Sequence, residues 1–484
     1  MSQEKTSKQY GVDTRPLTLV LFSRLNRPLR LLLGVGLFAL VYRMETPEGL
    51  SEEGRKAMAV FALCLTWWVL NVLPLMITSL MAIALIPLTG IMPAEQAYSL
   101  FGNSAVFFIM GAFILAACLM KSGLSTRLGL LFLQRFGHSP RSLLCAVFLM
   151  NAFMAFWMSE HAVAAMNFPI VMEIVMVLKL RQRRSSYAKA LFLALAWGST
   201  IGGVATLLGG GRAPLALGIL EQYDGTNPFT FLDWTLRALP VVVVMLGVGW
   251  LVITRFFPID QDSVADAETA LAEKVAKLGP MSRDEKAIGA VMLGTVATWV
   301  LAGHNLGLAN VAIGAIVLLF VFKLVKWRDV EEYVNWGIIL MYGGAICLGA
   351  ALNDSGAATW LAQRTLGLMA DSPTSAVAAL SASSWLLTEA ISNSAVVALM
   401  MPMGLGMADT IGLVPANIAP LIAIPAGLAF AFPIGTPANA IAYSSGFLRL
   451  RDIILPGAIM GATGWVVFNL TVRFYWTWAG YIHL

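Results

Sequence analysis

Long apolar runs without charged residues are the feature that most constrains the fold of this chain. Val241–Ile253 is one such run, and the runs are continuous instead of alternating with a period of two, which excludes a membrane β-barrel. Only 12% of the 484 residues are charged and 58% are hydrophobic, whereas soluble domains carry about 25% charged residues. We therefore predict an all-α polytopic membrane protein, with room for about a dozen spans of roughly 20 residues. Soluble enzymes, nucleic-acid-binding proteins and disordered chains are excluded.

The basic residues predict how the chain is oriented in the membrane. Residues 1–28 are polar and basic, and no small-residue cleavage site follows the first apolar run, Leu29–Tyr42. We expect a retained first span there and not a signal peptide. Lys and Arg concentrate in cytoplasmic loops, and most of the 32 basic residues fall in clusters that can share one side. We predict a bacterial inner (plasma) membrane protein with a cytoplasmic N-terminus and a C-terminus outside.

A re-entrant hairpin is predicted between Arg141 and Lys179. The 37 residues between them are tight for two full spans, which need roughly 20 residues each. Both flanks are basic and should therefore lie in the cytoplasm. The middle of the stretch, Met158–His161, is polar and charged. Such a segment is tolerated at membrane depth only where it is buried in protein or lines a cavity.

The second half of the chain repeats the first. An offset of 233 carries residues 111–123 onto 344–356, and it also carries Ser159-Glu160-His161 onto Ser392-Asn393-Ser394. An offset of 226 aligns the Gly-rich stretch 206–213 with 432–439. Matched Gly and Pro interruptions in two halves point to the binding site of a transporter. The second hairpin, 373–409, contains no Lys or Arg, so we place it on the outer side and predict an inverted-topology repeat.

These motifs resemble the divalent anion/sodium symporter family, the INDY-like dicarboxylate carriers. That family has a Ser-Asn-Thr motif at each of two opposed hairpin tips, and each motif is followed by a Gly/Thr-Pro-x-Asn helix break. Ser392-Asn393-Ser394 and Gly435-Thr436-Pro437-Ala438-Asn439 match the second half, and the resemblance extends over almost the whole chain. It implies about 11 transmembrane helices plus two opposed re-entrant hairpins, a homodimer, and an elevator-type inverted-repeat transporter.

The resemblance also implies ligands at the hairpin tips and helix breaks. A small anionic substrate is expected at Ser159, Glu160, His161, Arg212, Ser392, Asn393, Ser394, Thr436, Pro437 and Asn439. One sodium ion is expected in the second half, at Thr388, Ser392, Asn393, Gly435 and Asn439. No other cofactor is predicted, because the four cysteines lie in apolar runs without paired spacing and are interpreted as core residues. The lipid bilayer is expected as a partner, and nucleic acid is not.

The first half departs from the family pattern. Glu160 and His161 replace the Asn and Thr of its motif, Ala155 replaces a hydroxyl residue, and Gly210–Ala213 replaces the Thr-Pro-x-Asn break. An ionisable group at membrane depth is costly, by about 2.5–3.5 kcal/mol on insertion scales, and marks a functional site by default. In the family that the chain resembles, the hairpin tip lies against the helix break, which implies that Arg212 lies near Glu160. We predict that Arg212 takes the place of one sodium ion, with Glu160 balancing it when substrate is absent. The alternative is a static polar cluster that braces the hairpin.

Other ionisable residues receive narrower predictions. An imidazole in water titrates near physiological pH, and His161 is the only one of the four histidines deep in an apolar segment, so proton coupling remains open. Glu389 is expected on the arm of the second hairpin, facing the interior or the outer vestibule. Glu173 lies two turns before the basic loop and is expected to pair with Lys179 or Arg181.

The predicted organisation alternates between a scaffold and a transport domain. The segments are a cytoplasmic N-terminus 1–28, scaffold 29–136, transport domain 137–258 with the cytoplasmic-side hairpin, a cytoplasmic linker 259–286, scaffold 287–369, and transport domain 370–484 with the outer-side hairpin. Function is predicted as secondary transport of a small anion, with dicarboxylate as the family default. Sulfate, another oxyanion, a monocarboxylate, exchange and proton coupling remain open. A membrane-embedded enzyme is a remote alternative, because no catalytic or Walker-type motif occurs.

Overall fold

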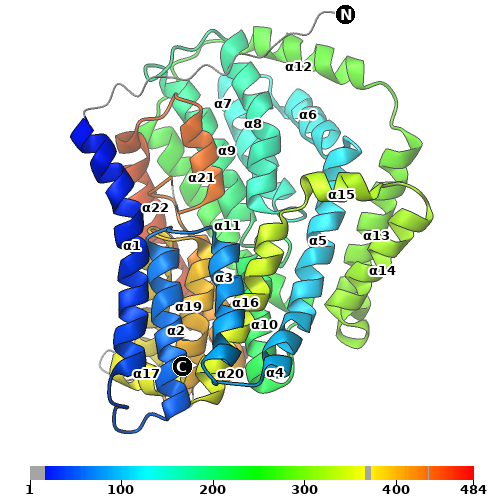
Figure 1. Ribbon diagram of the computed structural model, residues 1–484. Helices are drawn as coiled ribbons and strands as arrows, with labels where there is room; N and C mark the ends of the chain where they lie inside the picture. The colour runs from blue at the N-terminus through cyan, green and yellow to red at the C-terminus, as the bar shows by residue number, and fades with distance from the viewer. Residues whose placement is uncertain (1–16, 366–371, 409, 434, 484) are drawn as a thin grey trace, which may run out of the picture.

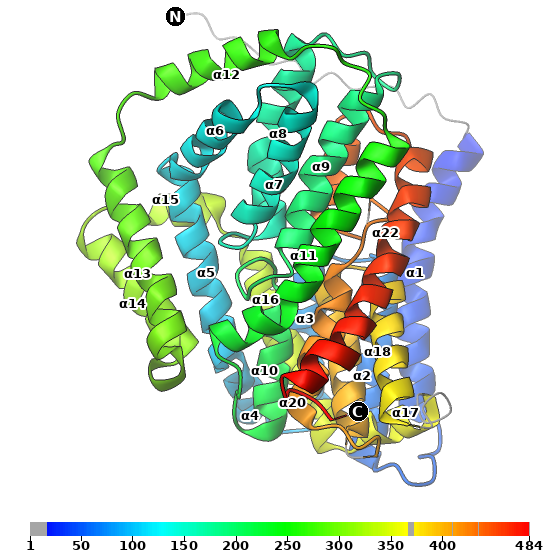
Figure 2. The same cartoon turned by 180° about the vertical axis from the view of Figure 1, so that it is seen from behind.

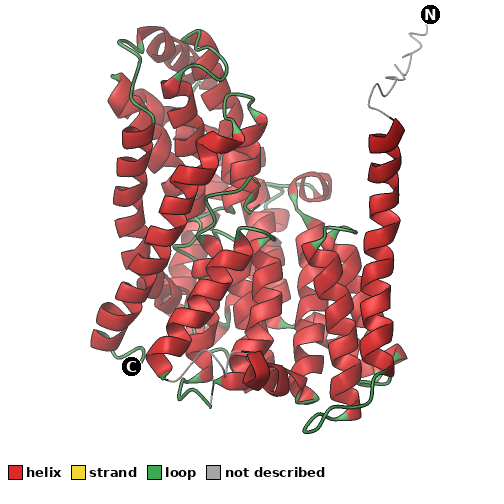
Figure 3. Cartoon of the chain, turned by 90° about the vertical axis from the view of Figure 1, so that its left-hand side faces the viewer, coloured by secondary structure: helices red, strands yellow, loops and turns green. Residues whose placement is uncertain are grey.

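The fold is all-helical, which confirms the predicted class. The computed structural model describes residues 17–365, 372–408, 410–433 and 435–483, and these ranges contain helices and loops but no strand (Figure 3). Part of the predicted N-terminal segment, residues 1–16, lies outside the described residues. Within the described ranges, six helical stretches are long and apolar enough to cross a membrane: Ala94–Lys121, Glu160–Val177, Phe231–Phe256, Arg283–Leu306, Trp336–Asp354 and Leu450–Trp476.

The first half of the chain contains two groups of helices. Those before the first hairpin are α1 (Leu17–Arg43), α2 (Glu52–Val69), α3 (Leu75–Leu88), α4 (Ala94–Ser99), the 3-10 helix η1 (Leu100–Gly102), α5 (Ser104–Lys121) and α6 (Leu124–Phe136). The hairpin and the helices after it are α7 (Pro140–Met154), α8 (Glu160–Val177), α9 (Ser186–Gly202), α10 (Arg212–Asp224) and α11 (Phe231–Phe256). A polar helix, α12 (Ala265–Leu278), then links the two halves.

The second half follows the same order. Its first helices are α13 (Arg283–Leu306), α14 (Leu308–Val321), α15 (Trp327–Tyr333), α16 (Trp336–Asp354) and α17 (Ala357–Thr365). The second hairpin and the elements after it are α18 (Pro373–Thr388), α19 (Asn393–Met407), α20 (Pro415–Ala423), the 3-10 helix η2 (Pro425–Gly427), α21 (Pro437–Ser444), α22 (Leu450–Leu470) and the π-helical η3 (Thr471–Trp476).

Both hairpins begin with the same cap. Ser139 precedes α7, its hydroxyl accepts from the Ser142 N–H at 3.2 Å, and the Ser142 hydroxyl accepts from the Ser139 N–H at 2.8 Å. Ser372 and Ser375 make the same reciprocal pair before α18, at 3.2 and 3.0 Å. A proline occupies the first helical position in both cases, where its missing N–H costs nothing. The offset between these caps is again 233, so the repeat extends to the entrance of each hairpin.

The two hairpins enter the molecule from opposite ends, as an inverted repeat requires. Helices α7 and α8 lie in the upper half of the molecule and α18 and α19 in the lower half (Figures 1 and 2). Each hairpin is followed by a helix that breaks, between α9 and α10 in the first half and between η2 and α21 in the second. Past each break the chain crosses into the other repeat: α10 packs on α19 and α20, and α21 packs on α8 and α9. The two halves are therefore interlocked around the breaks.

Helix α12 lies across the top of the molecule in Figure 2 and packs on α6 and α8. Lys274 of α12 forms an ion pair with Glu173 of α8. The predicted pairing of Glu173 with Lys179 or Arg181 is therefore wrong. The carboxylate meets the element packed against its own helix, about a hundred residues further along the chain, and not the basic loop that follows it.

Gly202 gives a test of the packing between α9 and the first hairpin. A Cβ at this position would lie 2.1 Å from the Ala152 carbonyl oxygen, so the two backbones are in direct contact. We expect Gly202→Ala to lower the melting temperature of the purified protein, because overpacking costs about 1–3 kcal/mol. Gly247→Ala is the control, since a Cβ there meets nothing within 4 Å. Equal melting temperatures for the two variants would contradict the close approach.

Candidate functional site

The centre of the candidate site is a buried ion pair between the first hairpin and the first helix break. Arg212 is the first residue of α10 and Glu160 the first residue of α8. Arg212 Nη1 lies 3.1 Å from Glu160 Oε2, and the two side chains are only 3% and 5% exposed. The Glu160 N–H donates to the Gly209 carbonyl at 2.8 Å. The hairpin tip therefore rests on the break, and Arg212 lies next to Glu160 as the sequence predicts.

Asn393 connects this pair to the second hairpin. Its Nδ2 donates to Glu160 Oε1 at 3.3 Å, and its Oδ1 lies 2.8 Å from the Thr388 hydroxyl. Glu160 and Asn393 are the two residues that the 233 offset aligns. The two opposed hairpin tips thus meet through a single hydrogen bond between equivalent positions of the repeat.

The Arg212 guanidinium fills a space that two glycines leave open. A Cβ at Gly427 would lie 2.4 Å from Arg212 Nε, and one at Gly210 would lie 2.6 Å from Nη1. Gly210 belongs to the first break and Gly427 to η2 of the second half. Nη2 is buried without any hydrogen-bond acceptor. The arginine therefore reaches across both halves and keeps one donor group unpaired.

Oxygen atoms gather in the second half. The Thr388 hydroxyl lies 2.8 Å from both Asn393 Oδ1 and the Ala426 carbonyl oxygen. Gly435 packs against the Thr388 carbonyl, because a Cβ on it would lie 3.1 Å from that oxygen. Asn439 donates through Nδ2 to the Ala429 and Phe432 carbonyls, at 3.2 and 3.4 Å, while its Oδ1 is buried without a partner. Neutral oxygens with one buried acceptor unpaired fit a small hard cation such as sodium.

The remaining predicted residues cap helices or lie beside the site. Ser159 is the buried N-cap of α8, and its side chain makes no cap hydrogen bond. Ser392 caps α19 by accepting from the Ala395 N–H at 3.3 Å, and half-buried Ser394 follows in its first turn. Thr436 caps α21 by accepting from the Asn439 N–H at 3.3 Å, and exposed Pro437 follows it.

His161 is separated from the ion pair. Its ring packs edge-on against Phe113 of α5, with ring centroids 6.4 Å apart, and among the described residues no hydrogen bond joins it to Glu160 or Arg212. The structure therefore does not join Glu160, His161 and Arg212 into one hydrogen-bonded network. Of these three residues, Glu160 and Arg212 form an ion pair, and His161 lies apart from it.

Glu389 contributes more than the sequence indicates. It lies at the end of the first arm of the second hairpin, as the C-cap of α18, and is 8% exposed. Of the two predicted orientations, the interior and the outer vestibule, its burial matches the interior. Its carboxylate accepts from the backbone N–H groups of Phe430, Ala431 and Phe432. The repeat contains a signal for this role. The offset of 233 aligns Glu389 with the apolar residue Phe156 at the first tip, and a charge that is present in only one of two repeated positions needs a partner of its own.

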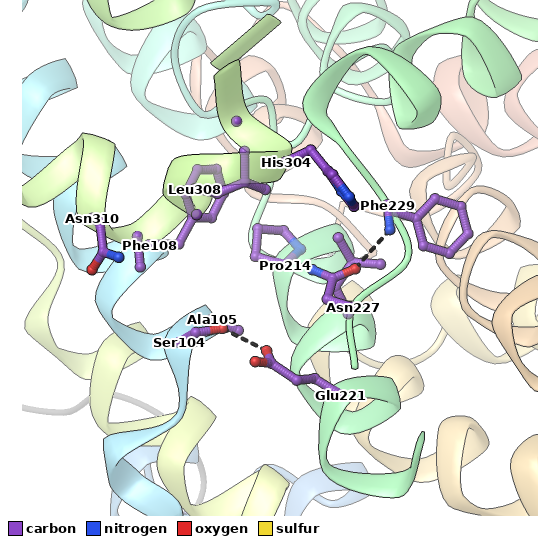
Figure 4. A pocket seen from close by; sticks show the side chains of 14 residues that line it. Ser104, Ala105, Phe108, Pro214, Glu221, Asn227, Phe229, His304, Leu308 and Asn310 are labelled. Atoms are coloured by element: carbon purple, nitrogen blue, oxygen red, sulfur yellow. Dashed lines mark hydrogen bonds between the residues drawn. The ribbon is translucent and has the colours of Figure 1, made fainter. Parts of the chain in front are cut away.

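A separate cavity of about 270 Å³ lies between α5, α10, α13 and α14 (Figure 4). The Ser104 hydroxyl of α5 donates to Glu221 Oε2 of α10 at 2.5 Å across it. Asn227 Oδ1 accepts from the Phe229 N–H at 3.0 Å on the opposite wall. None of the predicted ligands lines this cavity, which lies where the predicted scaffold and transport domain meet.

Opposed hairpins, matched helix breaks and buried polar tips define a multi-pass membrane transporter. Two solved transporters share the fold. YdaH of Alcanivorax borkumensis aligns with a TM-score of 0.54 and 17% identity over 86% of this chain and 98% of its own. MtrF of Neisseria gonorrhoeae, which represents a class of antimetabolite efflux pumps, aligns with a TM-score of 0.52 and 13% identity over 95% of both chains.

The sequence comparison identifies the family. Residues 25–482 match the sodium:sulfate symporter transmembrane region, so the chain belongs to that family. The sodium-dependent dicarboxylate transporter SdcS of Staphylococcus aureus is 27% identical over 96% of this chain and 95% of its own. The resemblance to the divalent anion/sodium symporters is therefore confirmed. The prediction of a transporter is also confirmed, against the alternative of a membrane-embedded enzyme. The roles of individual residues in binding substrate and sodium stay predictions.

The ion pair gives a test of stability. Removing one partner of a buried pair leaves the other charge uncompensated, at a cost of about 3–5 kcal/mol. We expect Glu160→Gln and Arg212→Met each to lower the melting temperature strongly, and the double variant to lose less than the sum of the two. Glu52→Gln, which breaks the surface pair with Lys56, is the control and should leave the melting temperature nearly unchanged, because solvent-exposed pairs contribute little to stability. Additive losses from the two central substitutions would contradict direct pairing.

Proposed function

We propose that this protein is a secondary active transporter of small dicarboxylate anions. The similarity to a transporter named for sodium-dependent dicarboxylate transport supports the substrate class. The observation that carries the proposal is Arg212, a buried guanidinium at the junction of both hairpin tips whose Nη2 has no acceptor. A guanidinium is always charged and matches a carboxylate with two parallel donors. Sulfate is the second candidate, because the family description names it.

Arg212 replaces one sodium ion in this proposal. A fixed cation cannot dissociate down a gradient, so the coupling step of that ion is absent. Glu160 neutralises the guanidinium between transport cycles, and substrate adds its carboxylate at Nη2. A single sodium ion is assigned to the second-half oxygens of Thr388, Asn393, Gly435 and Asn439, with Ser392 beside them. Exchange and proton coupling are the alternatives to this single-sodium mechanism.

Movement is proposed to follow the elevator scheme. Segments 137–258 and 370–484 form the moving transport domain, and 29–136 and 287–369 form the scaffold of a homodimer with a cytoplasmic N-terminus. The cavity between α5, α13 and α14 on one side and α10 on the other supports this boundary, because loose packing permits sliding. Between the described residues of α5 and α10, two hydrogen bonds cross the proposed boundary. The Ser104 hydroxyl donates to Glu221, and Asn103 Nδ2, at the N-cap of α5, donates to the Gly218 carbonyl at 3.3 Å.

Counterflow in proteoliposomes tests substrate and Arg212 together. Uptake is measured for dicarboxylates, sulfate and monocarboxylates, with sodium and pH varied independently. We expect dicarboxylate exchange in the parent protein and a loss of about ten- to a hundredfold in Arg212→Ala, since losing a charged hydrogen-bond partner costs about 1.5–3 kcal/mol and leaves Glu160 unpaired. Arg212→Lys should recover only part of the rate, because it keeps the charge without the planar fork.

Three outcomes would contradict parts of this mechanism. Transport of none of the anions would remove the substrate proposal, and undiminished uptake by Arg212→Ala would show that the cluster only braces the hairpin. Strict dependence on two or more sodium ions would contradict the replacement of one sodium by Arg212. Glu173→Gln, on the outside of the first hairpin, serves as the matched control and should retain uptake.

Cross-linking tests the domain boundary. In a variant without the four native cysteines, Ser104→Cys with Glu221→Cys places one thiol on α5 and one on α10. A short reducible thiol-bridging reagent should stop uptake by this pair, and reduction should restore it. Ser381→Cys with Asn469→Cys is the control, because both residues lie in the proposed transport domain and their side chains are bonded at 3.1 Å. Full uptake by the bridged Ser104–Glu221 pair would contradict motion at this boundary.

A further inference from the structure

The Glu389 carboxylate is fully engaged by backbone donors. Oε1 accepts from the Phe430 N–H at 2.9 Å and the Ala431 N–H at 3.2 Å. Oε2 accepts from Ala431 at 3.0 Å and from the Phe432 N–H at 3.2 Å. An ionised carboxylate is purely an acceptor, so three converging N–H groups are the partners that suit it. The geometry is that of a bound anion, supplied here by the chain itself.

Glu389 is also the one buried charge without an ionic partner in the described part of the chain. Four charged side chains are buried there: Glu160, Arg212, Glu285 and Glu389. Glu160 pairs with Arg212, and Glu285 pairs with Arg127 at 2.7 Å. The interior around the breaks therefore holds one positive and two negative side chains. With all of them ionised, one negative charge remains uncompensated.

Glu389 is connected to the second-half oxygens through its neighbour in the chain and through the backbone segment that its carboxylate binds. Glu389 directly follows Thr388, whose hydroxyl faces Asn393 Oδ1 and the Ala426 carbonyl. The backbone that it binds is held from the other side by Asn439, which donates to the Ala429 and Phe432 carbonyls. Both side chains therefore bind the same short segment of the second break, residues 429–432. Glu389 accepts from its N–H groups, and Asn439 donates to its carbonyl groups.

We propose that Glu389 is a positioning residue that supplies the single negative charge neutralised by one monovalent cation at the second-half oxygens. This rests on the proposed placement of sodium in the second half. The oxygens of Thr388, Asn393 and Asn439 are neutral, so the attraction for a cation comes from a fixed charge nearby. Because Arg212 already cancels Glu160, the interior has charge for one sodium ion and none for a second.

Sodium binding without substrate provides the test, since a ligand that binds the folded state raises its melting temperature with concentration. The full-length protein is titrated with sodium chloride against choline chloride at constant ionic strength. We expect Glu389→Gln to raise the half-saturating sodium concentration about tenfold or more, as the loss of a nearby charge in a medium of intermediate dielectric constant requires. Glu389→Asp keeps the charge and should bind sodium more tightly than Glu389→Gln, even if its shorter side chain lowers stability.

A charge-balanced variant separates charge from bracing. Glu160→Gln combined with Arg212→Met leaves Glu389 as the net charge, and its half-saturating sodium concentration should stay within about threefold of the parent even where transport is lost. Sodium stabilisation of Glu389→Gln at parental concentrations would overturn the proposal. So would equal weakening by Glu389→Gln and Glu389→Asp, since bracing alone would then explain both. Failure of the dicarboxylate proposal would leave this measurement interpretable, because it contains no substrate.

Discussion

The buried pair between Arg212 and Glu160 is the interaction around which the centre of this protein is organised. A lone charge at this depth would cost several kcal/mol, so each side chain requires the other within bonding distance. Glu160 lies at a hairpin tip and Arg212 at the start of a helix after a break. Pairing them therefore fixes the first tip on the first break, and Asn393 extends the contact to the second tip.

The broken helices impose a second requirement, because backbone groups away from water must all find partners. In both halves the break donates to the tip, but the side chain that makes the bond belongs to the break in the first half and to the tip in the second. In the first half, the Thr206 side chain of the break donates to the Phe156 carbonyl of the tip at 2.7 Å. In the second half, Glu389 of the tip accepts from the N–H of Phe432 in the break. Phe156 aligns with Glu389 and Thr206 with Phe432, so the same junction is closed by different chemistry.

Much of this architecture could be predicted from the sequence, because repetition carries spatial information. A common offset placed both hairpins, and the resemblance to the divalent anion/sodium symporters, in which the hairpin tip lies against the helix break, placed Arg212 near Glu160. The partners of Glu173 and Glu389 could not be predicted in the same way. Lys274 reaches Glu173 from a linker helix that has no counterpart in the repeat. The partners of Glu389 are backbone N–H groups, which leave no residue signature in a sequence.

The asymmetry between the halves also bears on energetics. In the proposed mechanism, the repeat keeps neutral Ser-Asn-Ser at one tip, and Ser-Glu-His at the other tip moves charge from a diffusible ion onto the chain. Arg212 packs against Gly210 and Gly427, so that charge is held in place by the same two breaks that a transporter needs for its ligands. A bound ion can leave between cycles, whereas a guanidinium must be neutralised in every state. Glu160 can do this only while the first tip stays on the first break. The proposed mechanism therefore makes the first hairpin the rigid member of the pair and leaves the second half to respond to ions.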